Sequence, residues 1–587
     1  MARKRPLGDD ELQMELEMNE NDDEEMDFEN DDSFLNESCS EVDDNEENCS
    51  RESDTFSDDE SGDDNLIHDK MKAKDGTEWE TVAKRARRVQ AANIITVPPG
   101  LTNKSCHITS KLDAFKCFVT PEIVDILVKY TNQKAQKWLA EWNAAHPDKQ
   151  CTWCNTDSTE MYAMIGILMI MGALHATKEQ VNVLWSTDPV FKRAIFTAAI
   201  ARNRFLSLLR FMRFDDFTTR DVRRETDKLA PIRDLFEMFA KECRECFNPS
   251  SHLTVDEQLV ASRNRCPFRV YMKQKPHRYG IKVWVLADNL NYYVHNLQVY
   301  TGKRDGVAEK NQGQRVVIDL VSHLRQGYGI TADNFFTSLD LVNDLLDRNL
   351  TYCGTVRKNK TFVPPELLPN KTKAEFSSIF GFTEKHTIVS YVPKKSKGVI
   401  LLSTEHHEHS ISGVDNSFKP DIILHYNATK GAVDTFDKLA AEYSVRRKTL
   451  RWPMVMFMDV IDTAGVNAFC IFSFKFPDWD GQRNDNRRRF LLELGKELVI
   501  PHVKVRLGNP VGLHSSIIAD MKTLVPDYQP NPVQPQGRGP IQGRCVNCPR
   551  NRDKKIRARC ERCQNFICKD HSQKVTQVTC TSCQNEQ

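Results

Sequence analysis

Three aspartates in the middle of the 587-residue chain are the residues best suited to catalysis. Asp256, Asp333 and Asp434 stand in the segments TVDEQL, TADNFFTS and YNATKGAVDTFDKL. A single aspartate is more often a turn or capping residue. Three convergent carboxylates, however, suit two Mg²⁺ ions, which activate an attacking hydroxyl and neutralise the leaving oxygen of a phosphodiester. The set therefore predicts metal-dependent chemistry on phosphodiesters.

A second group of ligand-type residues lies near the end of the chain, in four pairs whose members are each separated by two residues. These residues are Cys545, Cys548, Cys560, Cys563, Cys568, His571, Cys580 and Cys583. Four such ligands make a tetrahedral site, so the spacing predicts two structural Zn²⁺ ions that supply much of the folding energy of residues 544–587. By analogy with RING and PHD modules, alternating pairs share an ion, with Cys545, Cys548, Cys568 and His571 on one and the remaining four residues on the other. The spacing alone leaves the pairing open.

Basic residues surround these ligands and suit a DNA backbone or groove. They include Arg550, Arg552, Lys554, Lys555, Arg557 and Arg559. A plain basic surface or an import signal is the alternative. Two further cysteine pairs, Cys151 with Cys154 and Cys243 with Cys246, are better explained as buried thiols than as one more zinc site.

The elements that must position the aspartates follow from local patterns. Residues 251–260 alternate as a strand with Asp256 opposite Leu253 and Val255. Further strands are expected at 281–287 and 292–300, a helix at 314–325, and then a short strand ending at Asp333. This order begins a ribonuclease-H-like α/β layer, in which the first and fourth strands are neighbours, so Asp256 and Asp333 should meet. Asp434 falls in the first turn of a helix that follows Gly431.

Helical patterns flank this α/β core. A helix begins at Thr120 and Pro121, an N-cap followed by proline, and others are expected at 160–175, 201–213 and 232–247. The 201–213 helix has one apolar face with an arginine flank, which suits either phosphate contacts or ordinary solvation. Helical patterns return at 451–472 and 487–498. The interval 361–420 is expected to be an insertion with strands at 387–392 and 398–403.

The charge of the chain is divided unevenly. The formal net charge is -1, but residues 1–70 hold 28 acidic and 5 basic residues, which leaves 54 acidic and 76 basic residues downstream. An acidic tail on a basic body is typical of a protein that binds a polyanion. The cluster KRARR at 84–88 predicts nuclear import, with a solvated linker as the alternative.

The apolar and cysteine content indicates a reducing compartment and no contact with a membrane. No apolar run reaches the roughly 20 residues that span a bilayer, and the longest, 161–174, is expected to be a buried helix. Eighteen cysteines without a secretion signal favour reduced thiols.

The three acidic segments, together with SVRRKTLRWP, GTVRKNK and the cysteine-rich end, resemble the piggyBac family of DNA transposases from about residue 105 onward. The resemblance identifies Asp256, Asp333 and Asp434 as the catalytic triad and Asp437 as a further acidic position. It associates Arg357 and Lys360 with target DNA. One departure is Ala432, where the family usually has glycine.

The resemblance implies Mg²⁺-dependent cleavage of double-stranded DNA at transposon ends and joining into TTAA targets, by a nuclear homodimer. The alternative is a domesticated descendant that binds DNA and regulates chromatin or transcription without transposing. A weaker third reading is a protein-interaction factor built on the zinc module.

The expected architecture is multidomain α/β. It comprises a disordered acidic region (1–104), a helical dimerisation and DNA-binding domain in two parts (105–250 and 445–523), a ribonuclease-H-like catalytic domain (251–444), a linker (524–543) and the double-zinc module (544–587).

Overall fold

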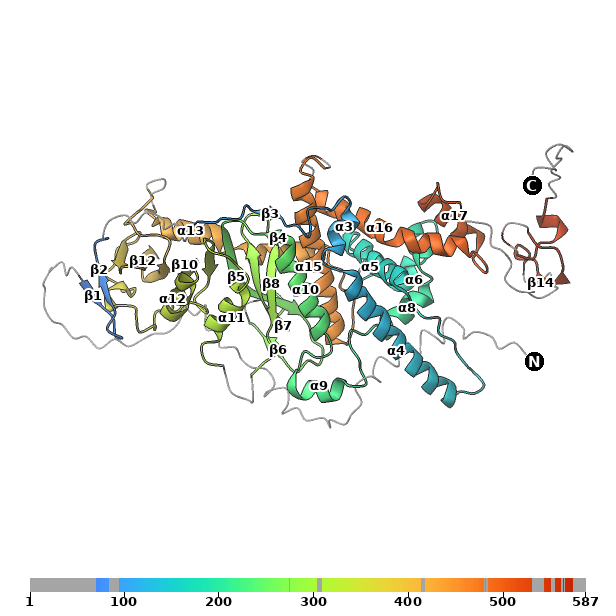
Figure 1. Ribbon diagram of the computed structural model, residues 1–587, viewed down its shortest axis with the longest axis horizontal. Coiled ribbons are helices and arrows are strands. Elements are labelled where there is room, and N and C mark those ends of the chain that lie inside the picture. Colours follow the sequence, from blue (N-terminus) through green and yellow to red (C-terminus); the bar gives the residue numbers. More distant parts are fainter. Residues whose placement is uncertain are drawn as a thin grey trace.

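The computed structural model describes residues 70–83, 94–273, 275–303, 309–412, 417–479, 481, 484–529, 543–549, 555–560, 563 and 565–573. Figure 1 shows a large mixed sheet on the left and in the centre, and a group of long helices to its right. The acidic tail, the KRARR cluster, Cys580 and Cys583 lie outside the described residues.

The centre of the sheet carries the segments that the sequence predicts. Its strands are β5 (His252–Ala261), β7 (Tyr279–Asp288), β8 (Val294–Val299), β9 (Gly329–Ala332) and β10 (Thr351–Thr355). They lie in the order β8-β7-β5-β9-β10. β7 pairs antiparallel with both β8 and β5, whereas β5, β9 and β10 run parallel to one another. Helices α11 (Gln312–Val321) and α12 (Leu339–Asp347) contribute apolar side chains to one core with this sheet.

The alternation of β5 sorts its side chains between two cores, as predicted. Leu253, Val255 and Leu259 are buried with α11 and α12, whereas Val260 is buried in the core that includes the long helices. In the parallel pair, the register runs from His252 opposite Gly329 to Val255 opposite Ala332. The next residue on each strand is a predicted catalytic aspartate.

The predicted insertion extends the same sheet. Beyond β10 come β13 (Lys397–Ser403), β12 (Thr387–Lys394), β11 (Ser378–Phe382), β2 (Glu78–Glu80) and β1 (Lys70–Lys72), and β6 (Arg269–Tyr271) lies at the opposite edge. The strands expected at 387–392 and 398–403 are therefore confirmed, and they pair with the central strands through β10 and β13.

The prediction that residues 1–104 lack ordered structure is wrong for the described part of that region. Strands β1 and β2 form a hairpin on the edge of the sheet, and β3 (Gly100–Leu101) pairs with β4 (Phe247–Asn248). Trp79 is fully buried, and its indole nitrogen donates to the carbonyl of Phe362 at 2.9 Å. Composition misled the prediction, because Trp79 and Met71 are apolar anchors within an otherwise charged segment.

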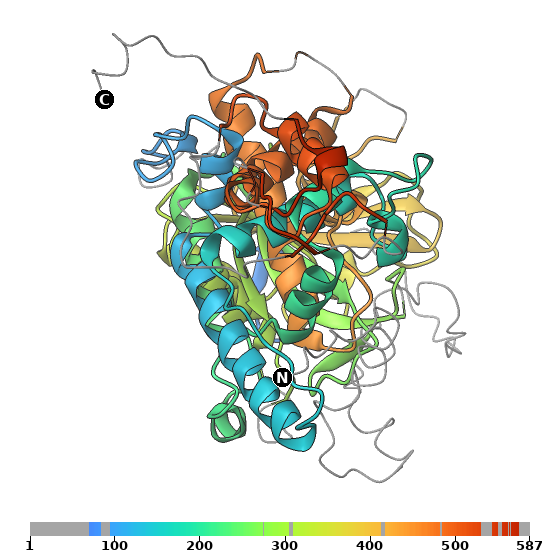
Figure 2. The ribbon, with the colours of Figure 1, turned by 90° about the vertical axis from the view of Figure 1, so that its right-hand side faces the viewer.

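The helical part is built from two stretches of chain. The first supplies α3 (Lys111–Lys116), α4 (Pro121–Ala145), α5 (Ser158–Ala173), α6 (Val181–Leu184), α7 (Ala194–Ala199), α8 (Arg202–Phe211), α9 (Arg220–Thr226) and α10 (Arg233–Cys246). The second supplies α15 (Trp452–Lys475), α16 (Asn486–Gly508) and α17 (Ser515–Leu524). Helix α16 packs against α5 and α3, α15 against α3, and α17 against α7. Figure 2 looks onto this end of the molecule, where the orange and red helices lie against the blue-green ones.

The crossing of α5 and α16 depends on two glycines. A Cβ atom on Gly166 would lie 2.7 Å from the carbonyl oxygen of Gly495, and one on Gly495 would lie 3.0 Å from the carbonyl oxygen of Gly166. The two backbones thus approach more closely than any larger residue allows. This contact joins chain segments separated by the whole sheet.

Helix α15 is long and apolar enough to cross a membrane by length and composition alone. However, 89% of its most apolar stretch is buried inside the protein, as expected of a core helix. The 161–174 run, which the sequence marks as the longest apolar stretch, is likewise a buried helix, α5.

The arginines of α8 are engaged within the protein. Arg204 forms a bidentate ion pair with Glu160, in which Nε donates to Oε1 at 2.8 Å and Nη2 donates to Oε2 at 2.6 Å. Arg210 lies over the ring of Trp138, and Arg213, which follows the end of α8, donates to backbone carbonyls. These contacts favour a structural role over the phosphate contacts that the basic flank suggested.

Candidate active site

Strands β5 and β9 bring together three carboxylates at the point where their pairing ends. Asp256, Glu257 and Asp333 each offer an oxygen, and the three atoms lie within 4.8 Å of one another. All three side chains are partly buried. The predicted meeting of Asp256 with Asp333 is thus confirmed, and it follows from the parallel register of the two strands.

The cluster is electrostatically unfavourable without a cation. Burial, together with the neighbouring charges of Glu257 and Asp333, raises the pKa of Asp256 well above its usual range. The backbone N–H of Glu257 donates to Asp256 Oδ1 at 2.8 Å. Crowded carboxylate oxygens that repel one another are the donor set that a hard divalent cation requires, so these residues fit Mg²⁺.

The loop after β9 holds Asp333 in place. The backbone N–H of Phe335 donates to Asp333 Oδ1 at 2.9 Å, and the hydroxyl of Thr337 donates to its carbonyl oxygen at 2.9 Å. Thr337 is in turn hydrogen-bonded to the buried hydroxyl of Tyr352 at 2.7 Å. Asp333 is therefore anchored to the neighbouring strand β10.

Asp434 lies beside the close group and is not part of it. It sits in the first turn of α14 (Ala432–Glu442), after the N-cap Gly431, and its side chain is 60% exposed. The ammonium of Lys275 lies 3.8 Å from Asp434 Oδ1 and donates to the carbonyl of Glu257 at 3.1 Å. Lys275 thus links Asp434 to the carboxylates on β5.

Ala432, where the family usually has glycine, is the first residue of α14. Alanine is more favourable than glycine in a helix, so the alanine has no conformational cost for the backbone at this position.

Asp437 belongs to a more deeply buried network. Burial and the charge of Asp459 raise the pKa of Asp437 to about 6. Asp459 accepts hydrogen bonds from Arg446 at 2.6 Å and from Gln258 at 3.3 Å. Asp437 therefore lies between the exposed Asp434 and the polar interior beneath β5.

Two residues of the site were missed by sequence reasoning. Strict strand alternation would place Glu257 on the apolar face with Leu253 and Val255, yet its carboxylate joins the cluster. Its position next to Asp256 in the sequence is the available signal. Lys275 stands in the charged segment KQKPHR, where no local pattern distinguishes it from a solvated lysine.

The predicted DNA-contacting residues lie at the edge of this site. Arg357 Nε donates to Asn334 Oδ1 at 2.8 Å, and Asn334 directly follows Asp333. Burial and the charge of Arg357 lower the pKa of Lys360. Both cations are thus near the loop that carries Asp333.

One of the two predicted zinc ligand sets is assembled. Cys545, Cys548, Cys568 and His571 have ligand atoms within 4.8 Å of one another. The Sγ atoms of Cys548 and Cys568 are 3.7 Å apart, and Cys568 Sγ is 3.1 Å from His571 Nδ1. The second set cannot be placed because Cys580 and Cys583 lie outside the described residues.

The C-terminal segment also carries two short strands and exposed cations. Strand β14 (Gly543–Arg544) pairs with β15 (Lys555–Ile556). Lys555, Arg557 and Arg559 are exposed, whereas Arg550, Arg552 and Lys554 are outside the described residues.

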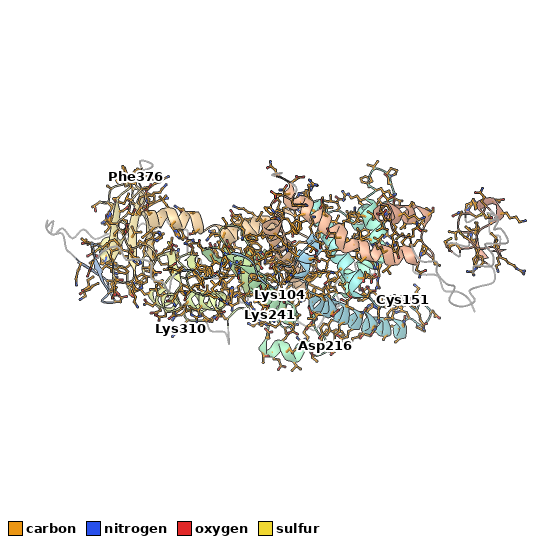
Figure 3. The ribbon with its side chains drawn as sticks, turned by 45° about the horizontal axis from the view of Figure 1, so that its top comes forward. Lys104, Cys151, Asp216, Lys241, Lys310 and Phe376 are labelled. Carbon is orange, nitrogen blue, oxygen red and sulfur yellow. The ribbon has the colours of Figure 1, made fainter. Side chains whose placement is uncertain are left out.

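The other cysteine pairs form no metal-type group within the described ranges. Cys243 and Cys246 are buried thiols. The prediction of buried thiols is wrong for the other pair, because Cys154 is exposed and Cys151 is only half-buried. Cys151, labelled in Figure 3, exchanges hydrogen bonds of 2.8 and 3.1 Å with Asn143 near the end of α4.

Comparisons with known proteins match this chain to transposases and to transposable element-derived proteins. A family model described as Transposase IS4 matches residues 110–469. Human PiggyBac transposable element-derived protein 3 is 23% identical over 380 residues, which cover 62% of this chain and 60% of that protein. Human PiggyBac transposable element-derived protein 2 is 22% identical over 395 residues, which cover 63% of each. The chain thus spans somewhat less than two thirds of the length of these curated relatives.

A solved structure extends the comparison to the fold. The cryo-EM structure of a piggyBac transposase synaptic complex with hairpin DNA matches with a TM-score of 0.69 and 31% identity. The match covers 81% of this chain and 98% of that one. Because the family model spans more than half of the chain and the solved transposase is matched over nearly its whole length, this chain belongs to the piggyBac family of transposases.

Proposed function

We propose that the chain is a transposase that cleaves and joins DNA strands in an active site formed by Asp256, Asp333 and Asp434. The observation that carries the proposal is the parallel pairing of β5 with β9, which sets Asp256 and Asp333 side by side. Two Mg²⁺ ions bound by the three aspartates would activate the attacking water or 3′ hydroxyl and neutralise the leaving oxygen.

The strand order supports a ribonuclease-H-like catalytic core. Three antiparallel strands are followed by a helix and two parallel strands, in the order β8-β7-β5-β9-β10. The segment between β10 and α14 extends this sheet and occupies the place of the expected insertion.

In this proposal Asp434 supplies the most exposed carboxylate and Lys275 the nearest cation. Lys275 neutralises part of the negative charge of the site before metal binding, because its ammonium lies close to both Glu257 and Asp434. Glu257 contributes a further oxygen beside Asp256. Asp437 would contribute from the buried side of α14, beside Asp459 and Gln258.

The proposed partner is double-stranded DNA, with transposon ends and TTAA sites as substrates. Support comes from the solved relative, a synaptic complex with hairpin DNA, and from the cations near Asp333 and in the C-terminal segment. The Cys545 cluster would hold one structural Zn²⁺, and Cys560, Cys563, Cys580 and Cys583 a second. We further propose that the protein is a nuclear homodimer, with the joined helical segments as its dimerisation and DNA-binding domain.

The alternative is a domesticated DNA-binding protein that no longer transposes. It is favoured by the curated relatives, whose names describe them as transposable element-derived. The two functions differ in whether the carboxylates are needed for any measurable reaction.

A cell-based excision assay with piggyBac-type ends from the same genome tests the proposal. We expect excision that restores TTAA, and a loss of at least about 10³-fold in Asp333→Asn, since metal stabilisation of the transition state contributes several kcal/mol. The matched control is Asp148→Asn, an exposed aspartate in the loop after α4.

The outcomes separate the two functions. Equal excision by wild type and Asp333→Asn would remove the catalytic assignment. No excision by wild type, despite binding to the same ends in the nucleus, would favour the domesticated alternative.

A further inference from the structure

Strand β5 carries a second cluster of ligand-type residues at its N-terminal end. His252 is the first residue of β5, four residues before Asp256, which places it roughly 13 Å away along an extended strand. It meets Glu405, which follows β13, and His425 in α13 (Asp421–Thr429). The residues are far apart in the sequence: His252 and Glu405, which are hydrogen-bonded, are separated by 153 positions.

The ligand atoms of this group are close and mutually oriented. His252 Nε2 lies 3.0 Å from Glu405 Oε1, and His425 Nε2 lies 3.8 Å from Glu405 Oε2. The two imidazole rings are 4.8 Å apart between centroids. Zinc bonds of about 2.0–2.1 Å place tetrahedral ligand atoms roughly 3.3 Å apart, a value between the two observed separations.

We propose that His252, Glu405 and His425 bind a divalent transition-metal ion of the zinc class. Two imidazoles and one carboxylate are a ligand set that zinc accepts, with a fourth position for water. The three side chains are 27%, 31% and 19% exposed, so an ion can reach them from solvent.

The surroundings of the cluster resemble the outer hydrogen bonds of a metal site. Ser251 Oγ lies 2.8 Å from His252 Nδ1, which leaves Nε2 directed at Glu405. The hydroxyl of Thr351 donates to Glu405 Oε2 at 3.3 Å. Such partners fix the orientation of ligating side chains.

His425 supplies an independent observation. Its Nε2 atom is buried and has no hydrogen-bond partner among the residues that the structure describes. A buried polar atom without a partner is costly, and it points to an absent ligand. The alternative is an ion pair between His252 and Glu405 alone, which would leave this nitrogen unsatisfied.

The packing leaves no space for a side chain at Gly329, which lies against two of the three ligands. A Cβ atom on Gly329 would lie 2.5 Å from the ring of His252 and 3.2 Å from Glu405 Oε2. Any other residue at this position would displace the two ligands. The absence of a side chain is therefore required by the geometry of the cluster.

An ion here would tie three structural elements together. β5 carries Asp256, the 403–412 segment leaves the extended sheet, and α13 leads directly into α14 with Asp434. The far end of α13 is already anchored, because Thr254 donates to the carbonyl of Thr429 at 2.6 Å. The metal would thus act as a clamp on α13 and would not take part in strand cleavage.

Cobalt binding by the full-length chain tests the proposal. The C-terminal thiolate sites are first filled with stoichiometric Zn²⁺, the free Zn²⁺ is removed by dialysis, and the carboxylate cluster is saturated with Mg²⁺. Co²⁺ is then titrated while visible absorption is recorded, because thiolates take up the limiting Zn²⁺ in preference to imidazole and carboxylate ligands. We expect a saturable band without thiolate-to-cobalt charge transfer. Glu405→Gln and His425→Ala should weaken cobalt binding at least roughly 100-fold, and Ser251→Ala about 10-fold to 100-fold.

The matched control is His409→Ala. His409 belongs to the same histidine-rich segment, but its ring packs against Phe380 at 4.2 Å, outside the cluster. Retained binding in this variant, with loss in Glu405→Gln, supports the site. No band in wild type, or the same affinity in every variant, overturns it. Glu405→Gln conserves side-chain size, and circular dichroism establishes that each variant is folded.

Discussion

The carboxylate cluster and the C-terminal Cys545 cluster are both suited to metal ions, but they are assembled in different ways. In the sequence, β7, β8 and α11 lie between Asp256 and Asp333. The two aspartates meet only because β5 pairs with β9. The four C-terminal ligands lie between Cys545 and His571, around two very short strands. One site is imposed by a large folded core, whereas Cys545 is the one buried apolar residue among the described residues of 543–573.

This difference assigns opposite roles to the two kinds of ion. At the carboxylate cluster, the fold holds like charges together at a cost, and in the proposed function a cation is needed for chemistry. In the C-terminal segment, the proposed ion would supply the stability that apolar burial cannot, which would make metal binding and folding one process. The predictions below test this contrast.

The largest effect should follow loss of the thiolate ligands. Cys568→Ser should unfold the C-terminal module and lower affinity for transposon-end DNA by roughly 100-fold, because structural zinc contributes on the order of 10 kcal/mol to such modules. The main melting transition of the sheet and helices should be unchanged. Differential scanning calorimetry and DNA-binding titrations measure the two effects.

Cys154→Ser is the control, since Cys154 is an exposed thiol elsewhere in the chain. Unchanged DNA binding in Cys568→Ser would show that the module is not part of the DNA interface. A shift of the main melting transition would instead show that the C-terminal module contributes to the stability of the sheet and helices.

A buried carboxyl outside both sites provides a sharper comparison. Burial raises the pKa of Asp462 to about 7, although Ser444 donates to it at 2.6 Å and the backbone N–H of Val445 at 2.8 Å. Its folded pKa exceeds the unfolded value near 4, so the folded state binds more protons and stability falls as pH rises from about 4 to 7. Asp462→Asn keeps the hydrogen bond from Val445 and should gain roughly 2–3 kcal/mol at pH 8.

Urea unfolding at pH 5 and pH 8, with and without Mg²⁺, measures this gain. Mg²⁺ should leave the Asp462 effect unchanged, because Asp462 is not part of a metal-type group among the described residues. If Mg²⁺ changed the stability gain of Asp462→Asn as much as it changes the effect of a substitution in the carboxylate cluster, the contrast between the two regions would be wrong.

The smallest effect is expected at Asp256 itself. Asp256→Asn removes one of the crowded charges, so the metal-free protein should become more stable by about 1–2 kcal/mol at neutral pH. Because burial raises the pKa of Asp256, the wild-type protein without metal should lose stability as pH rises above about 4, and this loss should be smaller in the variant.

Saturating Mg²⁺ should stabilise wild type and have little effect on Asp256→Asn. Thermal melts with and without Mg²⁺ make this measurement, with Asp148→Asn as the exposed control. A destabilised Asp256→Asn protein in the absence of metal would contradict the electrostatic account of the site.

Much of the local structure could be predicted from the sequence. The alternation of 251–260 gave β5, the Thr120 and Pro121 pair gave the start of α4, and the two-residue spacing gave the Cys545 ligand set. Each of these signals acts over a few residues, through strand alternation, helix capping or a chelate of fixed span.

The remaining features depend on contacts between distant segments. Only the tertiary structure added β1 and β2 to the sheet, joined α5 to α16 at two glycines, and brought Lys275 to Asp434. It also assembled His252, Glu405 and His425, whose separation in sequence leaves no local trace. The sequence determined which residues bear the chemistry because side-chain type and local period are written in it directly. The structure decided which of them meet, because register and packing are properties of the whole sheet.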